Sequence, residues 1–85
     1  MATILVVDDE RDHAQVMCEA LARLGHKCDV TYSLPEAMSR LDRKRYDVVV
    51  TDLVMDGRRD GLELLAASKR QHPPPPVLLV SAHGE

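Results

Sequence analysis

The chain has 85 residues, 45% of them hydrophobic and 29% charged, with a formal net charge of −3, and this length predicts a single domain spanning residues 1–85. The charge balance provides no basic face for nucleic acid or a membrane surface, and no apolar run reaches the roughly 20 residues of a membrane span. We therefore expect a globular, cytoplasmic protein that binds neither nucleic acid directly nor a membrane.

The first elements are a buried strand and an amphipathic helix. Residues 4–7 form a continuous apolar run, which is typical of a strand covered on both faces in a parallel sheet. Apolar residues then recur at helical spacing before Gly25, which predicts a helix that ends there. The predicted stripe consists of Ala14, Met17, Leu21 and Leu24.

An edge strand and a second helix follow. Residues 27–32 alternate, with Cys28, Val30 and Tyr32 on one side and polar residues on the other, which suits a sheet edge. The segment from Ser33 to Glu36 is a capping box with Pro35 at the first helical position. It predicts a helix through Leu41.

The second half contains two further strands and one further helix. Residues 46–51 predict a buried strand that ends at Asp52, and residues 77–80 predict a fourth strand. A third helix is expected between them, ended by the prolines at 73–76. Its periodic residues are Leu62, Leu65, Ala66 and Lys69. The proline run is most simply a stiff connector, and a polyproline segment that binds a partner is the alternative.

The alternation of strands and helices predicts an α/β fold. Because crossovers between parallel strands are right-handed, the chain should form a doubly wound parallel sheet of the flavodoxin-like type. We expect the strand order 2-1-3-4.

Polar residues follow three of the predicted strands directly. Asp8 and Asp9 come after the first strand, Asp52 after the third and Ser81 after the fourth. In open α/β sheets ligands bind outside the carboxyl ends of the strands, so these residues should meet at one edge. Neighbouring carboxylates repel unless a cation or proton neutralises them, which favours Mg²⁺, and an aspartate beside it can accept a phosphoryl group.

The cysteines and histidines show no spacing for a metal. Cys18 and Cys28 are expected to be free buried thiols. The histidines are expected at the surface or at helix ends; they are His13, His26, His72 and His83.

Four segments together resemble the receiver domain of bacterial two-component response regulators. They are Val-Val-Asp-Asp-Glu at 6–10, Asp52 with Met55 three positions later, Asp-Gly-Leu-Glu-Leu-Leu at 60–65, and Ser81-Ala82. The resemblance begins at the first strand and extends over the rest of the chain, with the segments in the family's order.

The resemblance implies a phosphorylatable signalling switch. Asp52 would accept a phosphoryl group from a histidine kinase or a small donor such as acetyl phosphate. Asp8, Asp9, Asp52 and the backbone carbonyl of Val54 would bind Mg²⁺, and Ser81 would be the hydroxyl that contacts the phosphoryl group. Such a module acts only on itself, with autophosphatase activity at most, so we expect no turnover enzyme.

The chain departs from the family pattern in two places. Asp56 stands where the family usually has proline, and the loop 56–59 brings Asp60 and Gly61 one residue late. The chain is also expected to lack the fourth helix, fifth strand and fifth helix, with the lysine that contacts the phosphoryl group. Uncovered sheet and helix surfaces then predict a homodimer or exchange of elements between chains. The sequence at 81–84 resembles receivers joined to ATPase-type, DNA-binding transcription activators, which makes such a domain the expected output partner.

Two other functions compete with the signalling switch. A truncated receiver fold could serve as an interaction or dimerisation module that no longer signals. A Mg²⁺-dependent phosphohydrolase of the haloacid-dehalogenase type is disfavoured, because those enzymes place two acids two positions apart after the first strand, whereas Asp8 and Asp9 are consecutive.

Overall fold

The computed structural model describes residues 1–52, 66, 69–70 and 74–80. The elements, in chain order, are β1 (Thr3–Val7), α1 (Arg11–Arg23), β2 (Lys27–Thr31), α2 (Leu34–Arg43), β3 (Val48–Asp52) and β4 (Val77–Val80). Most of the expected third helix, the loop 56–59, Val54 and Ser81 lie outside the described residues.

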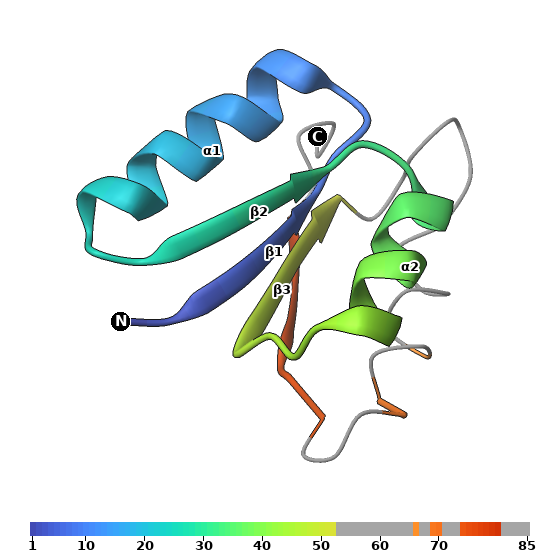
Figure 1. Cartoon of the computed structure of the whole chain (residues 1–85). Helices are drawn as coiled ribbons and strands as arrows, with labels where there is room; N and C mark the ends of the chain where they lie inside the picture. The colour runs from blue at the N-terminus through green and yellow to red at the C-terminus, as the bar shows by residue number, and fades with distance from the viewer. Residues whose placement is uncertain (53–65, 67–68, 71–73, 81–85) are drawn as a thin grey trace.

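The four strands form one parallel sheet in the order β2-β1-β3-β4, which confirms the predicted topology (Figure 1). β1 is central, and its register places Val7 opposite both Thr31 of β2 and Thr51 of β3. The carboxyl ends of these strands therefore lie at the same edge.

The described helices α1 and α2 lie on opposite faces of the sheet (Figure 1). On the α1 face, Ile4, Val6 and Val50 pack with Ala14. On the α2 face the cluster consists of Leu5, Val7, Ala37, Leu41, Tyr46 and Val49. Because successive side chains of a strand point to opposite faces, the continuous apolar run of β1 supplies both cores, as the sequence predicts.

α1 ends in a glycine turn. Gly25 has φ +89°, its amide donates to Ala22 O at 3.0 Å, and the His26 amide donates to Leu21 O at 3.2 Å. This is the Schellman arrangement, which favours glycine because other residues resist positive φ. Leu24 stands at the helix end and is 73% exposed, so its place in the predicted apolar stripe is wrong.

α2 begins at the predicted cap. The Ser33 hydroxyl accepts a hydrogen bond from the Glu36 amide at 3.3 Å. The helix starts at Leu34, so Pro35 is its second residue and not its first as predicted. Both positions suit proline, because the first turn of a helix leaves its amides without intrahelical acceptors.

The burial of Thr31 in β2 differs from what the alternation of the sequence suggests. Thr31, on the side of β2 expected to be polar, is completely buried and donates its hydroxyl to Val6 O at 3.3 Å. The internal hydrogen bond satisfies the hydroxyl in the core.

Cys18 and Cys28 are free as predicted but half-buried, which corrects the prediction of full burial. Burial and the neighbouring Cys18 thiol raise the pKa of Cys28 to about 12, so its thiol stays protonated at neutral pH.

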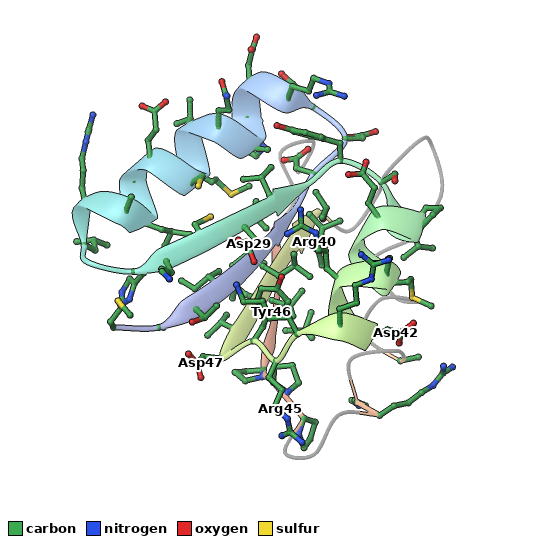
Figure 2. The ribbon with its side chains drawn as sticks, in the orientation of Figure 1. Asp29, Arg40, Asp42, Arg45, Tyr46 and Asp47 are labelled. Atoms are coloured by element: carbon green, nitrogen blue, oxygen red, sulfur yellow. The ribbon has the colours of Figure 1, made fainter. Side chains whose placement is uncertain are left out.

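A polar cluster connects the edge strand to the segment after α2. Asp29 of β2 accepts hydrogen bonds from the Tyr46 hydroxyl at 2.7 Å and Lys44 Nζ at 3.0 Å, and Arg40 lies on the same side (Figure 2). The hydrogen bond from the Tyr46 hydroxyl is the largest cause that lowers the pKa of Asp29, and the hydrogen bond from Lys44 is the next largest. The cluster stabilises the charged carboxylate in the middle of β2, where Asp29 pairs with Leu5 of β1.

Among the helices that the structure describes, none is long and apolar enough to cross a membrane.

Candidate functional site

The predicted acidic residues stand at the carboxyl edge of the two central strands. β1 ends at Val7 and is followed directly by Asp8 and Asp9, while Asp52 is the last residue of β3. Val7 pairs with Thr51, so the register places Asp8 beside Asp52 on adjacent strands. Neighbouring strands are about 4.8 Å apart, so the backbone brings these two positions together.

Asp8 is held from several directions and is only 1% exposed. Its amide donates to Thr31 O at 3.1 Å, which extends the β1–β2 ladder by one residue. Its Oδ1 accepts from the Glu10 amide at 3.0 Å, and its Oδ2 is hydrogen-bonded to Nδ1 of His13. A carboxylate buried to this extent requires such partners, because burial without them disfavours the charged form.

The other predicted site residues differ in how far the structure describes them. The side chain of Asp9 is exposed and has a partner. Asp52 is placed by its strand pairing with Val80 of β4. Val54 and Ser81 are outside the described residues, although Ser81 directly follows Val80 in the sequence.

His13 is a site residue that the sequence analysis did not select. It is the third residue of α1, and a side chain at that position can reach back to the residues before the helix, as the glutamate of a capping box does. The five-residue spacing between Asp8 and His13 was therefore a usable signal. It was a weak one, because the contact also depends on how α1 packs on the sheet.

A cation–π contact fixes the start of α1 beside the end of β2. The Arg11 guanidinium carbon lies 4.0 Å from the centroid of the Tyr32 ring. Such contacts stabilise partly exposed sites by about 0.5–1 kcal/mol. Arg11 also brings a positive charge close to the acidic edge.

The residues at this edge fit a hard divalent cation. The buried Asp8 carboxylate, with Asp9 beside it and Asp52 in register, offers oxygen donors, which Mg²⁺ prefers. No three potential metal ligands of the histidine, cysteine or acidic type gather among the described side chains, which do not include that of Asp52. The backbone register is therefore the structural support for a metal site here.

Comparison with known proteins gives a consistent family. The family model of the response regulator receiver domain matches residues 4–85. The nitrogen assimilation regulatory protein NtrX of Azorhizobium caulinodans is 35% identical over 82 residues, covering 95% of this chain and 18% of the relative. The DNA-binding transcriptional regulator NtrC of Escherichia coli is 37% identical over 82 residues, covering 96% of this chain and 17% of the relative. The chain thus spans less than a fifth of the length of these two relatives.

Solved structures agree with this result. The response regulator TrrA of Thermotoga maritima, crystallised in complex with Mg²⁺-BeF, matches with a TM-score of 0.86 and 28% identity, covering 99% of this chain and 72% of TrrA. TrrA in complex with the histidine kinase ThkA matches with a TM-score of 0.85, covering 100% of this chain and 72% of TrrA.

Proposed function

The chain belongs to the response regulator receiver domain family, whose members are phosphoacceptors in signalling, and we propose that Asp52 is its phosphoacceptor. The observation that carries this proposal is the register of β1 and β3, which aligns Asp52 with the buried Asp8 at the carboxyl edge. We further propose that residues 1–85 form one receiver domain.

The transfer step needs an attacking oxygen and a leaving group. A carboxylate oxygen of Asp52 would form a bond to phosphorus, while the bond from phosphorus to the donor nitrogen of a phosphohistidine breaks and its electron pair returns to that nitrogen. With acetyl phosphate the leaving atom is the acetate oxygen. The hydroxyl of Ser81, one residue beyond the partner of Asp52 in β4, would donate a hydrogen bond to the phosphoryl group.

The acidic edge would hold Mg²⁺ through Asp8, Asp9, Asp52 and the backbone carbonyl of Val54. The complex of TrrA with Mg²⁺-BeF supports this assignment through the shared family. Bound Mg²⁺ neutralises charge on the transferring oxygens. The Asp8 carboxylate would bind the Mg²⁺ ion directly or through a water molecule.

The donor of the phosphoryl group would be a sensor histidine kinase, which would meet this chain in the cytoplasm. The complex between TrrA and the kinase ThkA supports this proposal. The names of the NtrC relatives support a DNA-binding transcription regulator as the output. An ATPase-type activator remains our proposal for that output, and association between copies of this chain is a further one.

The proposal is tested by intact mass spectrometry after incubation with acetyl phosphate and Mg²⁺. We expect the parent chain to gain the mass of one phosphoryl group, and Asp52→Asn or removal of Mg²⁺ with EDTA to reduce the adduct to background. Asp42→Asn is the matched control, because Asp42 is an exposed acid at the end of α2 (Figure 2). An equal adduct on Asp52→Asn would contradict the assignment. Mg²⁺ binding without any adduct would favour the alternative of an interaction module that does not signal.

A further inference from the structure

The contact between His13 and Asp8 has no role in the function proposed above. His13 lies in the first turn of α1, and its Nδ1 is hydrogen-bonded to Oδ2 of Asp8. The two side chains differ greatly in exposure, at 32% for His13 and 1% for Asp8. The imidazole thus lies between solvent and the buried carboxylate.

The hydrogen bonds define how the Asp8 carboxylate is oriented. A carboxylate that binds a cation is ionised and only accepts hydrogen bonds, so Nδ1 of His13 has to carry the hydrogen for the contact to persist when a metal is bound. The Glu10 amide donates to the other oxygen, Oδ1, at 3.0 Å. Both oxygens therefore have a donor from the start of α1 or the residue before it, and the carboxylate cannot rotate without losing a bond.

We propose that His13 is a positioning residue that strengthens Mg²⁺ binding by holding the Asp8 carboxylate in one orientation. The inference rests on the proposed metal site. Each carboxylate oxygen has two lone pairs, so an oxygen that accepts from His13 or Glu10 retains one for a cation or its bound water. Hydrogen-bond partners of metal ligands generally act in this way, and their loss typically weakens metal affinity by about 10- to 100-fold.

The test is a titration with MgCl₂ at one fixed pH, followed through the amide NMR shifts of the 85-residue chain. We expect His13→Ala to raise the dissociation constant for Mg²⁺ about tenfold. His13→Asn should restore most of the affinity, because the amide nitrogen of asparagine can donate from near the position of Nδ1. Gln15→Ala, an exposed substitution on the same helix, should bind as the parent does. Thermal unfolding by circular dichroism verifies that each variant is folded.

A second measurement uses the parent alone and is independent of any folding defect. The ¹⁵N shifts of the His13 ring report which nitrogen carries the hydrogen, and the inference requires it on Nδ1. Hydrogen on Nε2 alone would overturn the inference.

The outcomes separate this inference from the function on which it rests. If the parent binds Mg²⁺ and His13→Ala binds it equally well, His13 does not position Asp8 for the metal. Tighter binding by His13→Ala would mean that the imidazole competes with the cation, which also overturns the inference while the metal site remains. A parent that binds no Mg²⁺ would overturn the metal site and the inference together.

Discussion

Tyr46 combines two roles in one side chain. Its ring packs in the core on the α2 face, and its hydroxyl donates to Asp29 of the edge strand at 2.7 Å. Burial is the main cause that raises the pKa of Tyr46 to about 12, and this hydrogen bond is the second. The hydroxyl therefore keeps its hydrogen and remains a donor across the physiological pH range. A single residue thus links the hydrophobic core to the charge on β2.

We predict that Tyr46→Phe lowers the free energy of unfolding by about 1.5 kcal/mol at pH 7, because it removes a hydrogen bond to a charged group and leaves the ring. The pKa of Asp29 is lowered from 3.8 on folding, so the stabilisation from its charged form is present above that pH and is lost as the pH falls further. The difference in the free energy of unfolding between the parent and Tyr46→Phe should therefore be largest above about pH 4 and should become smaller as the pH falls.

Urea unfolding at several pH values measures this difference. Tyr32→Phe is the matched control, because it removes a hydroxyl and leaves the ring on which Arg11 stacks. A difference between parent and Tyr46→Phe that widens as the pH falls would contradict the assigned role of Asp29.

At the scale of elements, a few residues determine one end of each described helix. The Ser33 hydroxyl accepts from the Glu36 amide at the start of α2, and Gly25 with positive φ ends α1. These signals are local, since each depends on atoms within a few residues of one another. For this reason the sequence predicts both ends to within a residue or two.

We predict that Ser33→Ala lowers the free energy of unfolding by about 1 kcal/mol, because an amide at the start of α2 loses its acceptor. Ser39→Ala is the matched control within the same helix, where Ser39 is exposed. It should leave stability unchanged or raise it slightly, because alanine has the higher helix propensity. Equal losses from the two substitutions, measured by urea unfolding, would show that the cap does not stabilise α2.

At the scale of the whole molecule, the two edges of the described sheet differ in character. β2 carries the charged residues Lys27 and Asp29, which discourage pairing with another chain. β4 carries Leu78, which is 57% exposed. Self-association predicted from the sequence would therefore use the β4 edge.

We predict that the parent chain forms a dimer at high concentration and that Leu78→Lys shifts it towards the monomer, because a charge on an edge strand opposes pairing. Val16→Lys, at a position on α1 that is 65% exposed, should leave the association unchanged. Sedimentation velocity measures both effects. A parent that sediments as a monomer at high concentration would rule out association between copies.

The candidate site was predictable only in part. The positions of Asp8, Asp9 and Asp52 follow from the strand ends, because parallel strands present their carboxyl ends at one edge. The strand ends did not predict the hydrogen-bond partner of Asp8, because the contact between His13 and Asp8 also depends on how α1 packs on the sheet. The roles of Asp52, Val54 and Ser81 remain predictions.

The sequence by itself located the four described strands to within two residues, together with the start of α2 and the end of α1, because periodicity and capping depend on residues close together in the chain. The alternation of strands and helices with right-handed crossovers predicted the order of the sheet. Only the tertiary structure decided that Thr31 is buried, that Leu24 is exposed and that His13 holds Asp8. Each of these depends on how one element packs against another. Packing arises from many side chains together, so a local pattern such as the spacing of Asp8 and His13 can suggest such a contact but does not determine it.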